Sequence, residues 1–497
     1  MKQLFILFLS LSLLTSCIEK QSVKPTSSNS QRWLSNSPVR MNDQSKRTVR
    51  IMPQSINDIT ISAPPESTAY LVFNNSSREN MIQLVKTGSS VSGEKVTRKQ
   101  FLNIFGESLI KKAEKEVKKL KAMKAADLKQ VNLNIKSKKD LTESKQQAQL
   151  GHVVNYYRGI LTGQIKSDDK TFKQLSRNFY DYLIQPTAHL FKNKTALVIV
   201  PDGILGFLPF ETLMTPDGQY LAEKYRITYT QSLKILDIVN QRQYSSNRKT
   251  LLAMGGAIYD ASTYKGDIVE SSHQLASLDK NVTQTINRGG SLRSAYGKLG
   301  IYWDNLPGTL NEVKSISTIF PDAKILKGRQ VTEANIKRLS DSSELQDYKI
   351  LHFATHGITI PEIPSMSSIV LSQFKQEGRE DGYLRTQEIA KLKLKADFVN
   401  LSACQTGLGK IYKGEGVVGL MHAFMIAGAN ALSTSLWEVD DDATKIFMEN
   451  LYSYVQNKGM SYADAMTVVK RQFIRGDFGE QYKIPYYWSG FVYYGKI

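Results

Sequence analysis

The chain has 497 residues, of which 41% are hydrophobic and 9% aromatic, so it can form two or three folded domains and is not generally disordered. Its net charge is +19, from 65 Lys and Arg against 46 Asp and Glu, which favours anionic partners. No basic recognition helix and no interleaving of aromatic and basic residues accompanies this charge, so we expect no nucleic-acid partner. The absence of a repeat of roughly 30 to 45 residues excludes a helical-repeat arm.

The N-terminus predicts a lipoprotein signal peptide over residues 1–16. Lys2 precedes an apolar run, Leu4–Leu14, that is too short to span a bilayer stably. The tetrad Leu14–Cys17 resembles a bacterial lipobox, in which Cys17 would be lipidated and become the mature N-terminus. The alternative is an ordinary secretory signal with an incidental cysteine. The lipobox predicts a membrane-anchored lipoprotein of the cell envelope, on its periplasmic or extracytoplasmic face, without choosing between inner and outer membrane.

Residues 17–65 are rich in Ser, Asn, Gln, Thr and basic side chains and have no sustained hydrophobic period, which is typical of a flexible tether. The chain has two cysteines, Cys17 and Cys404. Lipidation of Cys17 would leave Cys404 as the free thiol of the mature chain. Without a partner, it cannot form an intramolecular disulfide, even in an oxidising compartment.

A first folded section begins with a predicted hairpin of two strands, Tyr70–Phe73 and Met81–Val85. A lysine-rich helix follows, with eleven Lys and three acidic residues between Lys111 and Lys139. We interpret it as a helix packed on the body with a solvated Lys face, and the alternative is a patch for a membrane surface or nucleic acid. Its apolar stripe at helical spacing consists of Leu102, Phe105, Leu109, Ala113, Val117 and Leu120. We expect a loop over Lys136–Gln149 and a helix from Ser167 to Leu190.

Short, fully apolar runs then dominate, and these are typical of strands buried in a parallel sheet. They are Ala196–Val200, Leu251–Gly255, Lys349–Ala354, Ala396–Ala403 and Asn430–Leu436. Helical stretches lie between them, including Thr332–Leu339 and Gly416–Ala427. The alternation predicts an α/β fold with a mainly parallel sheet flanked by helices. The aromatic segment Tyr486–Tyr494 predicts a final strand tucked under the core.

Two of these strands lead directly into motifs that carry chemistry. Leu351–Gly357 delivers His356, and Val399–Gly407 delivers Cys404 after 404 − 356 = 48 residues, close to the roughly 50 of caspase-type enzymes. Side chains at the carboxyl ends of neighbouring parallel strands share one crevice. A thiol becomes a good nucleophile only when ionised, and a neighbouring imidazole promotes this. The pattern therefore indicates a cysteine peptidase, although Cys404 taken alone is more typical of a buried structural thiol.

Further stretches in the same order strengthen this interpretation. They are Leu197–Gly203, Leu208–Phe210, Leu306–Thr309 with Glu312, Gly414–Gly416 with Ala423 and Phe424, Ser435–Thr444 and Tyr486–Gly490. With the two catalytic motifs they resemble the CHAT family of caspase-like proteins, in the caspase, metacaspase and separase clan. The resemblance covers residues 66–497. It implies a caspase-like catalytic part over residues 246–497, preceded by a related non-catalytic α/β part over residues 66–245.

The family often carries N-terminal helical repeats, and this chain departs from it with a lipobox and tether instead. The resemblance implies a catalytic dyad, with Cys404 as nucleophile and His356 as general base and acid. It also assigns an oxyanion hole to the backbone N–H groups of Gly357 and Cys404, which agrees with the close approach that glycine permits. The alternative, that Gly357 is needed only for the turn after the strand, fits the sequence equally well.

The substrate pocket has one candidate residue, Asp440, in the acidic run Asp440–Asp442 after Trp437. A buried acid there would select a basic side chain before the cut. The alternative is that Asp440 caps the helix that follows.

The other histidines are expected to be structural. His352, His152, His189 and His273 are predicted core residues, and His422 a packing residue. No Cys or acidic pair stands at ligand spacing beside them, so we predict no metal site, and the dyad chemistry requires no cofactor.

The sequence as a whole predicts a membrane-tethered, caspase-like cysteine endopeptidase that cleaves protein or peptide substrates, with an activating protein partner left open. Two alternatives remain at this stage. One is a catalytically silent interaction or scaffold module with the same fold. The other is a cysteine hydrolase that acts on a non-peptide substrate.

Overall fold

The computed structural model describes residues 63–74, 80–128, 145–260, 303–358, 367–373, 380–402, 415–437 and 439–497. The chain divides into two compact units, Met1–Thr60 and Ile61–Ile497, and every described residue belongs to the second. The predicted signal peptide, Cys17, His273 and Cys404 lie outside the described residues, as does the predicted tether up to residue 62. Within the described ranges, no helix is both long and apolar enough to cross a membrane.

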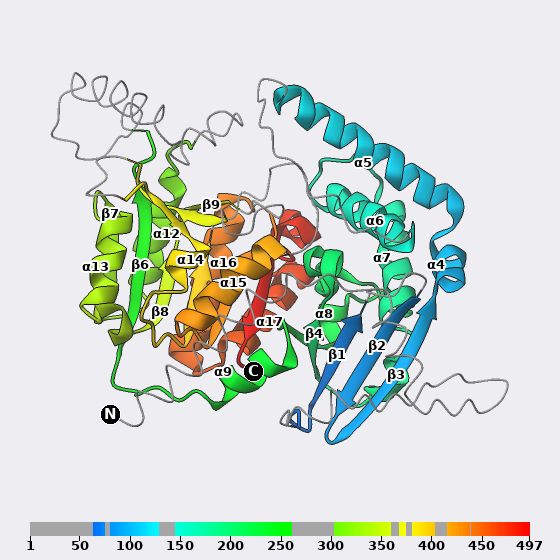
Figure 1. Ribbon diagram of the computed structural model, residues 1–497, viewed down its shortest axis with the longest axis horizontal. Helices are drawn as coiled ribbons and strands as arrows, with labels where there is room; N and C mark the ends of the chain where they lie inside the picture. Colours follow the sequence, from blue (N-terminus) through cyan, green and yellow to red (C-terminus); the bar gives the residue numbers. More distant parts are fainter. Residues whose placement is uncertain are drawn as a thin grey trace, which may run out of the picture. The chain divides into compact units, whose positions relative to one another are not determined.

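An eleven-stranded sheet forms the centre of the described unit, in the order β3-β2-β1-β4-β5-β14-β13-β12-β8-β6-β7 (Figure 1). In that order its strands are Ser90–Thr97, Asn80–Thr87, Thr68–Asn74, Ala196–Val200, Arg226–Tyr229, Phe491–Gly495, Ala431–Ser435, Phe398–Leu401, Tyr348–Phe353, Lys249–Ala257 and Lys324–Gly328. Neighbouring strands are parallel except in the pairs β1–β2, β2–β3 and β13–β14. The predicted α/β fold with a mainly parallel sheet is thereby confirmed.

Four helices cover the N-terminal part of the sheet: α4 (Arg98–Phe105), α5 (Glu107–Leu128), α6 (Lys145–Leu161) and α7 (Asp169–Leu183). The loop expected over Lys136–Gln149 is wrong from Lys145 on, because buried side chains such as Leu150 and Val153 pack a helix with a polar start. The predicted helix to Leu190 ends at Leu183, and a separate 3-10 turn, η1 (Ala188–Leu190), follows. Tertiary packing outweighed local polarity here.

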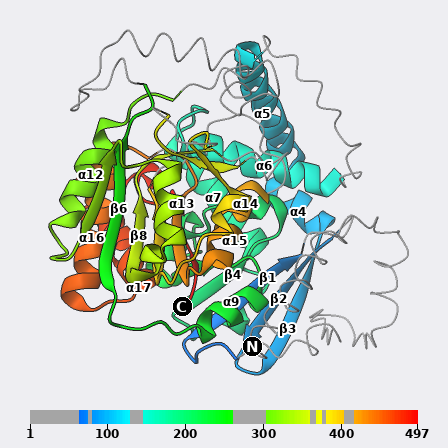
Figure 2. The same cartoon turned by 60° about the vertical axis from the view of Figure 1, so that its left-hand side comes forward.

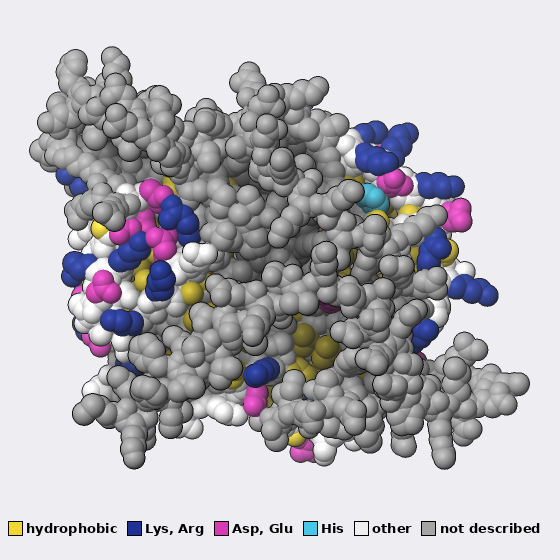
Figure 3. All heavy atoms as spheres, viewed as in Figure 1, with side chains coloured by type: hydrophobic (Ala, Val, Ile, Leu, Met, Phe, Trp, Pro, Cys, Tyr) yellow, Lys and Arg dark blue, Asp and Glu magenta, His cyan; other side chains and the backbone are white. Residues whose placement is uncertain are grey.

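The lysine-rich helix α5 packs on the body as the sequence suggested. Its apolar stripe includes the buried Ala113 and Val117, while Lys111, Lys115 and Lys118 are exposed. Figure 3 shows Lys and Arg side chains gathered over this helix. Glu107, Glu114 and Glu116 form ion pairs with three of its lysines, so part of the positive charge is neutralised within the helix.

Helices cover both faces of the C-terminal strands (Figure 2). On one face, α12 (Pro307–Ser317) packs on β6 and on α16 (Asp441–Lys458), which in turn packs on α17 (Tyr462–Arg475). On the other face lie α13 (Glu333–Asp341), α14 (Thr386–Ile389) and α15 (Glu415–Ala427). The connection between the two parts of the sheet runs through η2 (Gly203–Phe207), η3 (Phe210–Thr212), α8 (Leu221–Lys224) and α9 (Leu233–Gln241).

The last strand, β14, lies in the middle of the sheet rather than under the core. It runs parallel to β5 and antiparallel to β13, so it joins the N-terminal strands to the C-terminal ones. The stacked rings of Tyr229 and Tyr494, 5.3 Å apart, fill this joint. The predicted strand is also shorter than expected, since Pro485–Tyr487 forms the turn η7 and Ser489 Oγ donates to the carbonyl of Pro485.

A small antiparallel sheet, β11-β10-β9, follows the end of β8 in the fold. Its strands are β9 (His356–Ile358), β10 (Ser368–Val370) and β11 (Tyr383–Arg385). The register places His356 opposite Val370 and Gly357 opposite Ile369. The histidine motif Leu351–Gly357 therefore continues from the large sheet into the small one.

Candidate active site

The two predicted motifs leave the large sheet at the same edge. β8 and β12 are parallel neighbours with Phe353 opposite Leu401, and the N–H of Ser402 donates to the carbonyl of Phe353 at 2.8 Å. His356 follows three residues after the end of β8 and is 3% exposed. Cys404 would follow three residues after the end of β12, just beyond the described residues. Their shared position is the carboxyl edge of the sheet, where α/β proteins bind ligands.

The imidazole of His356 has a defined tautomer. Its Nε2 lies 2.8 Å from the backbone oxygen of Asp304. A carbonyl oxygen only accepts hydrogen bonds, so Nε2 carries the proton in the neutral ring and Nδ1 keeps its lone pair. His356 therefore offers Nδ1 as a proton acceptor.

Aromatic side chains hold the ring of His356 in place. The ring of Tyr259 lies 4.5 Å away at 65°, and that of Trp303 lies 5.1 Å away at 43°. The Tyr259 hydroxyl accepts the backbone N–H of His356 at 2.9 Å and donates to the carbonyl of Val370 at 3.0 Å. Trp303 Nε1 donates to the hydroxyl of Tyr383 at 2.9 Å, which fixes the indole. Both the backbone and the ring of His356 are thus constrained.

Burial controls the protonation of this group. It lowers the pKa of His356 below its ordinary 6.5, and the nearby Asp304 opposes that shift with a smaller effect. The imidazole is therefore neutral at pH 7 and able to take up a proton. Burial also raises the pKa of Tyr259, so its hydroxyl stays protonated and can donate to Val370.

The segment that supplies the Asp304 carbonyl is clamped by Asn305. Its Oδ1 accepts the backbone N–H groups of Tyr259 at 2.9 Å and Asp260 at 3.2 Å, and its Nδ2 donates to the Asp260 carbonyl at 2.5 Å. The segment before α12 is thereby tied to the chain that leaves β6. Sequence analysis missed Tyr259, Trp303, Asp304 and Asn305.

His352 lies in the core, as expected. It is fully buried, with Nδ1 at 2.8 Å from the Tyr452 hydroxyl and Nε2 at 3.1 Å from Glu312 Oε1. Of the other predicted structural histidines, His189 and His422 are exposed, so the predictions that they lie in packed surroundings are wrong, and His152 is half-buried rather than in the core. All three lie on helical elements, where a one-position change of phase moves a side chain from core to solvent.

Asp440 is exposed and caps α16, with Oδ1 accepting the N–H of Ala443 at 3.1 Å. The next residue, Asp441, approaches the first turn of α12 so closely that its carboxylate would collide with a Cβ added to Gly308. Burial and the charge of Glu312 raise the pKa of Asp441. Two acidic side chains thus stand on the loop after β13, at the same edge of the sheet as His356.

The model of the CHAT domain matches residues 173–496. The chain belongs to the CHAT domain family. The match begins inside the section that sequence analysis assigned to residues 66–245 and extends through both catalytic motifs.

Two curated relatives share this part of the chain. Tetratricopeptide repeat protein 28 of Homo sapiens is 22% identical over 362 residues, and its Mus musculus counterpart is 23% identical over the same length. The aligned region covers 64% of this CHAT chain but only 13% of each relative. The chain therefore spans about an eighth of the length of these proteins.

Solved structures of caspase-like peptidases are similar to this CHAT chain. Separase of Saccharomyces cerevisiae, in complex with securin, has a TM-score of 0.41 and 11% identity, covering 86% of this chain and 30% of that one. The RgpB pro- and mature domains of Porphyromonas gingivalis have a TM-score of 0.35 and 11% identity, covering 69% and 75%. At these TM-scores neither likeness bears on what this chain does.

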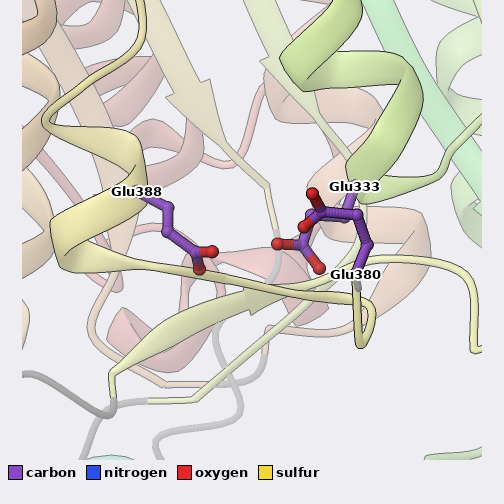
Figure 4. Close-up of side chains that lie close together, drawn as sticks. All are labelled: Glu333, Glu380 and Glu388. Carbon is purple, nitrogen blue, oxygen red and sulfur yellow. The ribbon is translucent and has the colours of Figure 1, made fainter. Parts of the chain in front are cut away.

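A cluster of three carboxylates elsewhere in the CHAT domain resembles a cation site. The oxygens of Glu333, Glu380 and Glu388 lie within 4.8 Å of one another (Figure 4). Lys337 Nζ, however, lies 2.7, 2.5 and 2.7 Å from these three side chains. Its ammonium already supplies the positive charge that the cluster needs, so we assign no metal ion to these described residues.

Proposed function

We propose that this CHAT domain is a cysteine endopeptidase, with Cys404 as the nucleophile and His356 as the general base and acid. One observation carries the proposal. His356 is buried, neutral at pH 7 and held by the Asp304 carbonyl in the tautomer that leaves Nδ1 free to accept a proton, at the sheet edge to which β12 delivers Cys404. A histidine that served only packing would need neither this tautomer nor this place.

The reaction would run as an acyl transfer. His356 Nδ1 takes the proton of the Cys404 thiol, and the thiolate attacks the scissile carbonyl carbon. The backbone N–H groups of Gly357 and Cys404 stabilise the oxyanion that forms. The imidazolium then protonates the leaving amine, and water hydrolyses the thioester to regenerate the thiol. No cofactor takes part in these steps.

The acidic start of α16 supports a preference for a basic residue before the cut. Asp440 is the residue that the sequence nominated, yet its carboxylate also caps the helix. Asp441 stands beside it and approaches α12. Asp440→Asn and Asp441→Asn therefore separate the two, because an amide oxygen still caps but no longer attracts an ammonium or guanidinium group.

Location is a second part of the proposal. A lipidated Cys17 would anchor the protein to the envelope membrane, and the exposed lysines of α5 would favour an anionic bilayer surface. Membrane fractionation of Cys17→Ser tests the anchor, which is excluded if the variant stays in the membrane fraction. Salt titration of liposome binding by a variant with four α5 lysines reversed tests the surface contact.

The test of activity is cleavage of a diverse peptide library by the full chain. Cys404→Ala and His356→Ala should each reduce cleavage by about 10³-fold or more. His422→Ala is the matched control, because His422 is exposed on α15 and should change nothing. Cleavage that survives both active-site variants refutes the dyad. If the wild-type chain cleaves no peptide, a scaffold module is favoured. If it cleaves no peptide but hydrolyses a non-peptide ester, the alternative of a cysteine hydrolase is favoured.

A further inference from the structure

We propose that Glu312 and His352 position the end of β12 through a buried network of polar contacts, and that Ser402 is its contact point. The link to catalysis rests on the function proposed above, since Ser402 precedes Cys404 by two residues. These side chains are positioning residues and do not touch substrate.

Ser402 is held at both its backbone and its side chain. Its N–H donates to the carbonyl of Phe353 on β8, and its Oγ donates to Glu312 Oε1 on α12 at 2.5 Å. Ser402 is 7% and Glu312 6% exposed, so water does not compete well for either group. The strand end that leads to Cys404 is therefore fixed to two separate elements.

Glu312 has an unusual environment for a buried carboxylate. No lysine or arginine of the described residues forms an ion pair with it, and its close neighbours are the Ser402 hydroxyl and the His352 imidazole. Its charge also contributes to the raised pKa values of Asp441 and Tyr452, which face it from α16. Replacing such a group by an apolar side chain often stabilises a protein, so Glu312 is a weak candidate for a purely stabilising residue.

His352 is oriented from its far side. The hydroxyl of Tyr452, whose pKa burial raises well above its ordinary value, stays protonated and donates to Nδ1. Since Nδ1 accepts, Nε2 carries a proton, and it lies 3.1 Å from Glu312 Oε1 as a polar contact without the alignment of a hydrogen bond. Asn400 lies opposite His352 across the two strands, with Nδ2 at 3.1 Å from Nδ1. The network thus runs from Tyr452 through His352 to Glu312, and meets Ser402 there.

Asn400 and Ser402 project to the same face of β12 because side chains alternate along a strand. The network consequently contacts β12 at two successive positions on that face. If Ser402 lost its acceptor, the strand end would keep its backbone pairing with β8 and β13 but would lose its side-chain contact with α12. A shift of about 1 Å at a reacting atom can cost roughly 10²-fold in rate, so the effect belongs in kcat rather than in KM.

Ser402→Ala is the direct test, and Ser433→Ala is its matched control. Ser433 is fully buried on the neighbouring strand β13, opposite Asn400, and its hydroxyl lacks a hydrogen-bond partner in the described structure. Both changes remove one buried hydroxyl. Only the change at Ser402 removes a bond to Glu312.

The experiment uses the full chain with Cys17→Ser, which leaves Cys404 as its single thiol. The readouts are the pH profile of Cys404 alkylation by iodoacetamide, and kcat and KM for a cleaved library peptide. We expect Ser402→Ala to lower kcat by tenfold to a hundredfold at unchanged KM and to shift the alkylation profile. Glu312→Leu should behave in the same way. Glu312→Gln keeps an acceptor oxygen, so its kcat and its alkylation profile should both stay close to those of the wild type.

Equal effects of Ser402→Ala and Ser433→Ala on the alkylation profile would overturn the proposal, whatever their size. So would a Glu312→Gln variant as impaired as Glu312→Leu. Urea unfolding identifies any variant that does not fold. If Glu312→Leu fails to fold, the two single variants Ser402→Ala and Glu312→Gln decide between the outcomes. Alkylation needs no peptide cleavage, so an inactive wild type whose thiol responds to Ser402→Ala would refute the peptidase and keep the network.

Discussion

The two parts of the sheet each bury a glutamate shortly after a Leu-Pro motif, and they treat it differently. In the N-terminal part, Glu211 on η3 follows Leu208–Phe210, and its Oε1 lies 2.6 Å from Lys470 Nζ while Oε2 accepts from the Tyr229 hydroxyl. In the C-terminal part, Glu312 follows Leu306–Thr309 and meets only imidazole and hydroxyl groups among its described partners.

Glu211 therefore has the environment of a structural carboxylate, and Glu312 that of the positioning residue proposed above. The ammonium of Lys470 balances the charge of Glu211 directly, next to β5 and β14 where the two parts of the sheet join. Among the described residues, Glu312 instead has only the Ser402 hydroxyl and the His352 imidazole as close polar neighbours, and neither is a permanent cation. A buried carboxylate usually has a cationic partner, and Glu312 has none among the described residues. Exceptions of this kind are common near functional sites, and Glu312 lies in the same part of the sheet as His356.

The largest effect on stability should come from Lys470→Met. It would leave the carboxylate of Glu211 buried without its counter-ion, and breaking a buried pair in this way typically costs about 3–5 kcal/mol. Urea unfolding should show the loss as a lower midpoint at an unchanged m-value.

The double variant Lys470→Met with Glu211→Gln is the control. It removes the charge as well as its partner, so it should recover much of the loss. If Lys470→Met alone cost less than about 1 kcal/mol, Glu211 would not depend on a fixed counter-charge, and the contrast with Glu312 would disappear.

A second prediction concerns the Glu333 cluster on α13, which also lies in the C-terminal part. Burial, reinforced by a hydrogen bond to Glu380, raises the pKa of Glu333 from 4.5 to about 8, although Lys337 opposes the shift. The unfolded chain loses this proton near its ordinary pKa of 4.5, before the folded chain does. The stability that the protonated group contributes is therefore complete below pH 4.5 and is lost as the pH rises toward 8.

Glu333 Oε2 accepts the backbone N–H groups of Asp381 and Gly382 at 3.0 and 2.9 Å. Glu333→Gln keeps an acceptor oxygen for these two bonds but has no group that titrates. Between pH 5 and 8 the wild type should lose on the order of 2 kcal/mol relative to this variant, since one pKa unit corresponds to about 1.4 kcal/mol. Parallel urea curves at several pH values measure the difference. An equal pH dependence of the two proteins would show that Glu333 is ionised throughout.

The sequence predicted the strands of the large sheet well, because strands buried on both faces appear as continuous apolar runs such as Ala196–Val200. It did not predict the place of β14. Strand order depends on contacts between segments far apart in the chain, and Tyr494 meets Tyr229 across a long sequence separation. Periodicity carries no information of that kind.

The same limit applies to the candidate site. His356 was found because a histidine and a glycine follow a buried strand. Its partners Asp304 and Tyr259 lie 52 and 97 residues away and act through a backbone carbonyl and through a hydroxyl that accepts a backbone N–H. Every residue type has a backbone carbonyl, so any residue could serve as the acceptor at position 304. A sequence motif therefore cannot identify this position.

The smallest expected effect on stability comes from the lowered pKa of His356. Burial lowers its pKa in the folded chain, so the unfolded state binds a proton first as the pH falls through 6.5. The stability that the neutral ring contributes is present above pH 6.5 and is lost as the pH falls toward the folded pKa. NMR titration of labelled histidines in Cys404→Ala, with His356→Ala to assign the signal, should give a midpoint below 6.5.

Trp303→Ala sharpens this last test, because the indole packs 5.1 Å from the imidazole and its removal admits water. The midpoint of the His356 titration should then move back upward, while Nε2–H still donates to the Asp304 carbonyl. A midpoint at or above 6.5 in the intact pocket would mean that the carbonyl, rather than burial, governs the proton. A midpoint above 7 would further mean that most His356 rings are charged at pH 7 before the reaction begins, and the pairing of His356 would then resemble the fixed pair of Glu211 and Lys470 more than the Glu312 network.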